Sequence, residues 1–411
     1  MLEILGASQE FINLEYNQKE QQEILKYYKL MMKERSMAKP RRYVDKCLTH
    51  GMRNNPKAGT LVCNNVVLHR HLLQQPLKTK RMRSNLQFML RNLPKLIEGL
   101  IFMSTIAGKR FWLSCTMNII KLSQFLTQGL WVQDHPFFQL PHFTKREVSQ
   151  CLRGKKKGVK TIRQYLELSQ EDRKGLVDFN EDQKRDVMDA CNRMSLFDID
   201  VKPFVEDETE IATNDLVTVR VTITRKNLKD GEFARPVLTS ANHPKDQERR
   251  ENIWVLLSSI LNQKGLCRHL SCLPKKISDQ GRVVTTDLKI RAPPKPGTYN
   301  YSMLVMSDCY MGLDVEQKIT LKVIPEQDLP AYEVHPEDAE LDAQPSLFAV
   351  TTENDFMEDS ESDDDGDDDD DDGKGASNED SSESKKKGGE SKKNGAIDLS
   401  DSSSDEDEDG I

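Results

Sequence analysis

The strongest candidates for chemistry are the acidic side chains between residues 363 and 372. Nine aspartates concentrate negative charge on a chain too polar to fold, and such a segment attracts Lys- and Arg-rich partners in a salt-dependent way. A purely solubilising tail is the alternative that composition leaves open. The nine residues are Asp363, Asp364, Asp365, Asp367, Asp368, Asp369, Asp370, Asp371 and Asp372.

Six serines in the same region could carry phosphorylation. Each has Asp or Glu three residues further on, which is the spacing that acidophilic casein-type kinases favour. Each phosphate would add roughly −1.5 to −2 charges and strengthen binding to a basic partner. Ile397 and Leu399 also precede an acidic run, a pattern that can add a strand to a ubiquitin-like modifier. The serines are Ser360, Ser362, Ser377, Ser402, Ser403 and Ser404.

Metal and catalytic chemistry have less support in the sequence. Cys267, His269 and Cys272 lie close together, but no fourth ligand stands near them and the spacing is narrow for zinc. We therefore predict no metal and no cofactor. The motifs GxxxxGK[ST], GxSxG and HExxH are absent, as is GxGxxG after a strand. We accordingly predict no catalytic residue and no enzymatic activity.

One basic turn could contact nucleic acid. The stretch "RGKKKGVK" places Lys155, Lys156 and Lys157 between Gly154 and Gly158, and bases beside glycines can approach phosphates closely. Solvated basic turns are common, however, and the motif is short. On the sequence signal alone, nucleic acid is therefore not the favoured partner.

The elements that must position these groups differ along the chain. Residues 355–411 hold 24 acids and 6 lysines, so residues 1–354 carry a net charge of +10 although the whole chain carries −8. The first 134 residues have helical periodicity, with helix breaks predicted at Pro94 or Gly108. Capping signals then predict four short helices, at 145–152, 161–167, 170–176 and 181–194.

From residue 199 the apolar period changes to two, and Pro and Gly separate the short runs, as an antiparallel sandwich requires. We predict an α+β multidomain chain. Its parts are a helical bundle (1–134), a helix-hairpin-helix-like unit (135–197), an immunoglobulin- or fibronectin type III-like antiparallel β-sandwich (198–326) and a disordered acidic tail (327–411).

The stretch "SDCYMGLD" interrupts the alternation near the end of the predicted sandwich. We expect it to be the loop between the last two strands, where such folds carry contacts. Asp308, Tyr310, Met311 and Asp314 are then candidates for partner binding. For Tyr310 and Met311, packing across the loop is the alternative, and the residue types favour it slightly.

Five stretches that follow one another along the chain, and are quoted at the end of this paragraph, together resemble the Brl domain. That domain closes the cytosolic part of the Sec sixty-three translocation protein and also follows the helicase cassettes of spliceosomal Brr-type RNA helicases. The resemblance covers about residues 7–325 and implies a helical bundle, a helix-hairpin-helix-like unit and a fibronectin type III-like sandwich. The stretches are "IIKLSQFLTQGLW", "FFQLPHF", "VKTIRQYLEL", "LVTVRVTITR" and "SDCYMGLD".

Of the two branches, the acidic tail and the missing Walker loop favour the translocation protein. That branch implies a non-enzymatic scaffold for post-translational protein translocation into the endoplasmic reticulum. The sandwich would dock on the Sec-type protein-conducting channel, and the tail would bind the basic N-terminal region of the Sec sixty-two partner.

The same branch implies a location on the cytosolic face of the endoplasmic reticulum membrane. The chain as given is expected to be soluble, because charges interrupt its most apolar stretch at residues 96–120. A lumenal Hsp70 would be a partner only if a J domain lies upstream. The alternative is an accessory Brl module of a Brr-type RNA helicase, which binds nucleic acid or protein.

Overall fold

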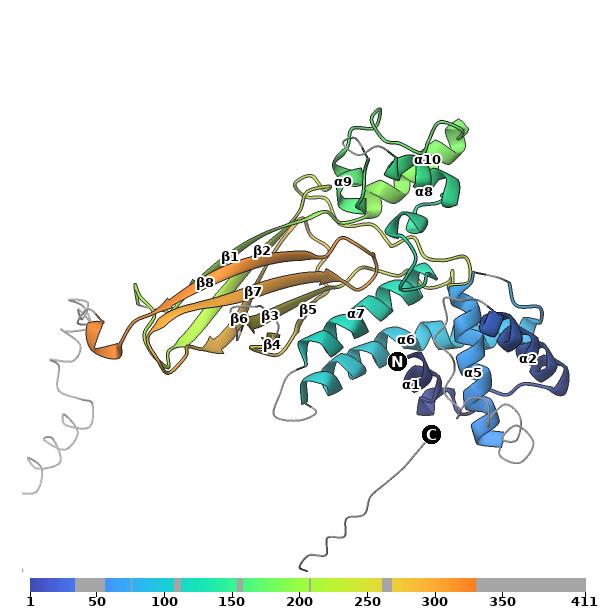
Figure 1. Cartoon of the computed structure of the whole chain (residues 1–411), viewed down its shortest axis with the longest axis horizontal. Coiled ribbons are helices and arrows are strands. Elements are labelled where there is room, and N and C mark those ends of the chain that lie inside the picture. The colour runs from blue at the N-terminus through green and yellow to red at the C-terminus, as the bar shows by residue number, and fades with distance from the viewer. Residues whose placement is uncertain are drawn as a thin grey trace, which may run out of the picture. The chain divides into compact units, whose positions relative to one another are not determined.

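The computed structural model describes residues 1–33, 56–74, 76–106, 112–153, 158–206, 208–260 and 268–329. Residues Met1–Ala331 form one compact unit, shown in Figure 1. The acidic run at 363–372, the six candidate serines and the Ile397–Leu399 stretch lie outside the described residues. The predicted disorder of the tail falls on the same undescribed segment and therefore stays a prediction.

Helices build the N-terminal part. They are α1 (Leu2–Gly6), α2 (Gln18–Lys33), α5 (Pro56–Leu72), α6 (Lys80–Ile106) and α7 (Leu113–Gln128). Contrary to prediction, Pro94 does not end α6, which continues for twelve more residues. Proline removes one helical hydrogen bond, but buried Leu90, Leu93 and Ile97 hold both sides of it against the core. The other predicted break, Gly108, lies outside the described residues.

A smaller helical unit follows. It contains η3 (Pro136–Gln139), α8 (Lys145–Leu152), α9 (Ile162–Glu167) and α10 (Glu181–Arg193). Thr144, Thr161 and Asn180 each form a capping box at the start of α8, α9 and α10, which explains why the boundaries could be predicted. The helix predicted at 170–176 is wrong. Ser169 caps only a turn there, and Gly175 has a left-handed φ of 85° that ends it.

Two antiparallel sheets form the C-terminal part. One has the order β1–β2–β6, from β1 (Phe197–Phe204), β2 (Leu216–Arg225) and β6 (Val283–Arg291). The other has the order β4–β3–β7–β8, with β5 also paired to β3. Its strands are β3 (Ile253–Ile260), β4 (Arg268–Leu270), β5 (Lys275–Ile277), β7 (Gly297–Ser307) and β8 (Val315–Val323). The chain is therefore α+β with antiparallel sheets.

Three apolar cores hold the compact unit together. One fills the space between the two sheets, where one face of β2, formed by Val217, Val219, Val221 and Ile223, is buried. A second core joins the N-terminal helices to the outer face of β3 and β7. A third joins the small helical unit to the loop after β7. Because each helical core includes residues of the strands or of the loop after β7, the four-part division of the chain remains a proposal.

Candidate functional site

The loop Ser307–Asp314 lies where the helical parts meet the sandwich. The structure brings together all four residues that the sequence singled out there, but it buries three of them. Asp308, Tyr310 and Met311 are 5%, 1% and 4% exposed, and Asp314 is partly buried. These three side chains pack within the chain. For Tyr310 and Met311, packing across the loop was the alternative to partner binding. We call this loop and its polar partners the junction.

Three glutamines bind the loop to the helices. Gln124 and Gln128 lie one turn apart on α7, and their side-chain amides donate to the carbonyls of Ser307 (2.8 Å) and Cys309 (3.0 Å). Gln139 of η3 donates to the Met311 carbonyl at 2.8 Å and accepts from its N–H at 3.0 Å. Each amide satisfies loop backbone that has no strand partner. In the sequence, the signal for these glutamines is that each is a polar residue within an apolar run.

Asp308 is the most heavily bonded residue of the junction. One carboxylate oxygen accepts from the Asn252 N–H, and the other accepts from the Asn252 side chain, both at 2.8 Å. The Arg249 guanidinium donates to the second oxygen at 2.5 Å. The ion pair is nearly excluded from water, so it fixes the segment before β3 to the end of β7.

A second buried acid, Glu251, links the small helical unit to the sandwich. It accepts hydrogen bonds from the hydroxyls of Ser195, just after α10, and Ser307. Burial raises the pKa of Glu251 to about 7. Gln124 donates to both the Ser307 carbonyl and Asp314, and burial raises the pKa of Asp314 to about 6. One hydrogen-bonded chain thus connects two acids that titrate near neutral pH.

Replacing Gly312 by alanine should reduce the free energy of unfolding by about 1–3 kcal/mol. Gly312 has a left-handed φ of 77°, and an added Cβ would meet Ile162 at 3.1 Å and Pro136 at 3.2 Å. Both the backbone strain and the contacts oppose the side chain. Denaturant unfolding measures the effect. Gly231→Ala is the control, because Gly231 has a similar φ but nothing within 4 Å of its added Cβ. An equal loss in both variants would contradict the role of the contacts.

An exposed stripe runs along α6 on the side away from its core. Phe88 and Phe102 are 41% and 58% exposed, and Arg91 and Lys95 lie between them on the same face. Fourteen helical residues separate the two rings along the axis, or about 21 Å. Phe11 contacts the Phe88 ring edge to face, which holds that ring in place. We call these four residues the α6 stripe.

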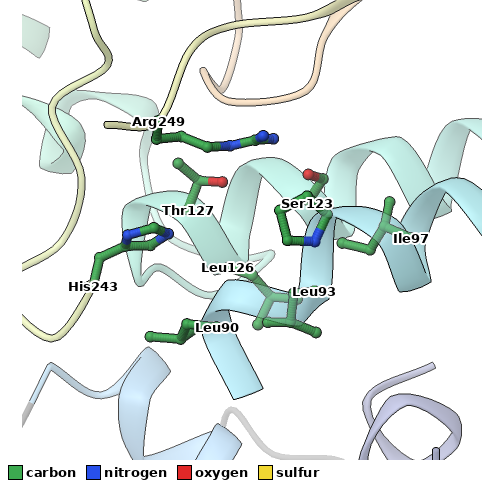
Figure 2. Close-up of a pocket in the computed structure, with 9 residues that line it drawn as sticks. Leu90, Leu93, Ile97, Ser123, Leu126, Thr127, His243 and Arg249 are labelled. Atoms are coloured by element: carbon green, nitrogen blue, oxygen red, sulfur yellow. The ribbon is translucent and has the colours of Figure 1, made fainter. Parts of the chain in front are cut away.

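A groove flanks the middle of this stripe. The segment 243–252, which leads into β3, lies against α6 and α7, and Figure 2 shows its His243 and Arg249 reaching over Leu90, Ser123 and Thr127. The space beneath them is about 10 Å³, enough for roughly one water. A larger opening of about 300 Å³ lies outside it. Arg91 forms an ion pair with Asp246, which links α6 to the segment.

The remaining sequence candidates are less informative. Cys267 lies outside the described residues, as do Gly154, Lys155, Lys156 and Lys157. His269 lies on β4 and Cys272 just after it, both partly buried. Within the described ranges, no three His, Cys, Asp or Glu residues are grouped as a metal site would require. In that same part of the chain, every helix is too short or too polar to cross a membrane.

Comparison with known proteins identifies relatives for most of the compact unit. A family model described as the Sec63 Brl domain matches residues 1–320. The human "U5 small nuclear ribonucleoprotein 200 kDa helicase" is 28% identical over 271 residues, which cover 66% of this chain and 12% of the relative. The Arabidopsis thaliana "DExH-box ATP-dependent RNA helicase DExH12" is 29% identical over 212 residues, covering 52% and 9%. The Caenorhabditis elegans U5 helicase is 25% identical over 323 residues, covering 79% and 13%.

These relatives correct the choice of branch. The sequence favoured a translocation scaffold on the endoplasmic reticulum membrane, with a Sec-type channel, the Sec sixty-two partner and a lumenal Hsp70 as partners. That interpretation of function, partners and location is wrong, because the matched relatives are helicases. The sequence also did not favour nucleic acid as a partner, and that prediction is wrong for the same reason. The chain spans only about an eighth of the human relative, so the activity of the whole relative is not thereby assigned to it.

Proposed function

The chain belongs to the Sec63 Brl domain family, and from this premise we propose that it is an accessory module of a Brr-type RNA helicase. In this role the chain binds RNA and holds its helical parts and sandwich in one arrangement. It does not hydrolyse ATP itself, because the printed sequence contains no phosphate-binding loop of the GxxxxGK[ST] type. The helicase names of its relatives support this role.

The α6 stripe is the observation that carries RNA binding. Exposed aromatic rings give unpaired bases a surface for stacking, and this stacking tolerates any sequence. Arg91 and Lys95 lie between the rings, where they can neutralise backbone phosphates. Bases paired in a duplex offer no free face to such rings, so single-stranded RNA is the form that fits.

The buried hydrogen bonds of the junction also support RNA binding by α6. Gln124 and Gln128 attach α7 to the loop after β7, and α7 packs against α6. The exposed stripe is therefore backed by a helix that is bonded to the sandwich. Such backing reduces the freedom that RNA binding would otherwise have to remove.

We also propose finer assignments for the sandwich and for the small helical unit. The strand order β1–β2–β6 facing β4–β3–β7–β8 fits a fibronectin type III-like sandwich, and the Tyr299 hydroxyl donates to the Lys295 carbonyl as in a tyrosine corner. The short capped helices α8, α9 and α10 fit a helix-hairpin-helix-like unit. The division at residues 134, 197 and 326 follows from these assignments.

Replacing Phe88 and Phe102 together by alanine should weaken binding of the full chain to a ten-nucleotide oligouridylate by tenfold or more. Each lost stack is worth about 1–3 kcal/mol. Fluorescence anisotropy of labelled RNA measures the affinity. Phe233→Ala is the matched control, because Phe233 is 69% exposed on a loop of the sandwich. Undetectable RNA binding by the unaltered chain at low salt, or an equal loss in the control, would exclude the proposal.

A further inference from the structure

We propose that the opening between α6 and the segment 243–252 is a binding site for a single nucleotide. Its phosphate would lie among the bases of the pocket, and its ring would pack on the wall formed by Leu90 and Pro94. This site shares Arg91 and Lys95 with the α6 stripe but not its two aromatic rings, so a free mononucleotide should enter it without a longer RNA strand. The proposal therefore does not depend on the proposed function.

The size of the pocket suits such a ligand. Its volume is about 300 Å³, at the lower limit of small-molecule sites. Two elements far apart in the sequence form it: α6 contributes the apolar residues and two bases, and the segment contributes only polar and charged residues. The lining residues are Leu90, Arg91, Pro94, Lys95, His243, Gln247, Glu248, Arg249, Arg250 and Asn252.

The charge of the pocket selects an anion. Arg91, Lys95, Arg249 and Arg250 line it, and Glu248 is the one acid among the lining residues. Lys95 forms no ion pair with any acid that the structure describes. Arg250 approaches Glu248 only at 3.7 Å, and both side chains are more than half exposed. Such an exposed pair is weak and can exchange its carboxylate for a phosphate.

One base of the pocket is held in position before any ligand arrives. Asp308 of the junction holds Arg249, whose side chain is 12% exposed and lines the pocket. Burial lowers the pKa of the neighbouring His243, so that its imidazole is neutral at pH 7 and can donate or accept. Fixed donors bind phosphate more tightly than flexible lysines because less side-chain entropy is lost.

The apolar wall distinguishes a nucleotide from a simple anion. Leu90 and Pro94 face the pocket from one turn of α6. Because proline has no N–H, the Leu90 carbonyl lacks its usual helical donor at position 94. That carbonyl is an acceptor for an amino or hydroxyl group of the ligand. Arg91, Arg249 and Arg250 are each paired with an acid, so Lys95 and the weakly paired Arg250 are the bases that a phosphate would engage first.

Calorimetric titration of the full chain with adenosine 5′-monophosphate tests the site. We expect saturable binding at millimolar concentration or below, and weaker binding of inorganic phosphate. Arg250→Gln should weaken nucleotide binding about tenfold, the value of one charge-assisted hydrogen bond. Arg83→Gln is the matched control, because Arg83 is exposed on α6 and does not line the pocket. It should change the affinity less than twofold.

Three outcomes would overturn the proposal: no saturation by the nucleotide, equal affinity for inorganic phosphate and nucleotide, or equal losses in Arg250→Gln and Arg83→Gln. Phe102→Ala separates this site from RNA binding, since Phe102 lies on the stripe and not in the pocket. That variant should bind the nucleotide normally. RNA binding without nucleotide binding would exclude only the pocket, and the reverse result would exclude only the proposed function.

Discussion

Replacing Asp308 by alanine should reduce the free energy of unfolding by about 4 kcal/mol. The substitution leaves the Arg249 guanidinium buried without its counter-charge, and breaking a buried ion pair in this way costs about 3–5 kcal/mol. It also removes the acceptors of the Asn252 N–H and side-chain amide. Unpaired buried donors add to the cost. Denaturant unfolding followed by circular dichroism measures the change.

The exposed pair formed by Asp287 and Arg220 provides the control. Asp287 also accepts two hydrogen bonds from an arginine, but both side chains are at least one-third exposed on the sheet surface. Asp287→Ala should therefore cost less than about 1 kcal/mol. Asp308→Asn keeps the size of the side chain and serves if the alanine variant does not fold. Equal losses for Asp308 and Asp287 would contradict the central place of Asp308 in the junction.

The stability of the protein should fall as pH rises through 7, and Glu251 should cause much of that fall. Its pKa is about 7 in the folded chain against 4.5 as the reference value, so the folded state binds more protons than the unfolded state between these pH values. Stability from this group is full below about pH 4.5 and is lost as pH rises to about 7. The difference between these two pKa values corresponds to about 3 kcal/mol.

Glu251→Gln tests this dependence, because the amide cannot titrate. Its oxygen can accept from one of the hydroxyls of Ser195 and Ser307, and its NH2 group can donate to the oxygen of the other. From pH 5 to pH 8 the unfolding free energy of the wild type should fall relative to that of the variant. Asp314→Asn should act with the same sign, around its pKa of about 6. A difference that stays constant between pH 5 and pH 8 would show that Glu251 does not titrate in this range.

Local patterns predicted the elements well where the local signal and the tertiary environment agree. The alternation in β2 matches one fully buried face, and the capping boxes at Thr144, Thr161 and Asn180 begin three helices. The signal failed where packing overrides propensity. Pro94 stays within α6 because the core holds the helix on both sides, and the cap at Ser169 begins a turn that Gly175 ends.

The junction could not be predicted from local patterns. Gln124 and Ser307 are 183 positions apart, and no periodicity indicates that the Gln124 amide will donate to the Ser307 carbonyl. The sequence identified "SDCYMGLD" as notable but could not tell an exposed loop from a buried one. In the fold, glutamines of two helical parts surround that loop, and three of its four residues that were predicted to bind a partner are buried within the chain.

The family was predicted correctly and its branch was not. The choice of branch depended on the acidic tail and on a missing Walker loop. The predicted tail lies outside residues 1–320, which the family model matches, and the aligned region is only 9–13% of the length of these helicase relatives. The absence of a helicase motif from so small a share of such a protein does not separate the branches.

Photo-crosslinking of 4-thiouridine RNA to the full chain, with mapping of the crosslinked peptides by mass spectrometry, tests RNA binding by α6 most directly. We predict that the crosslinks concentrate in residues 80–106 and decrease when Phe88 and Phe102 are both replaced by alanine. The junction keeps these residues in place, so the crosslinks should stay on α6 at different salt concentrations. Crosslinks confined to other elements, or none at all, would contradict the assignment of α6 as the RNA-binding surface.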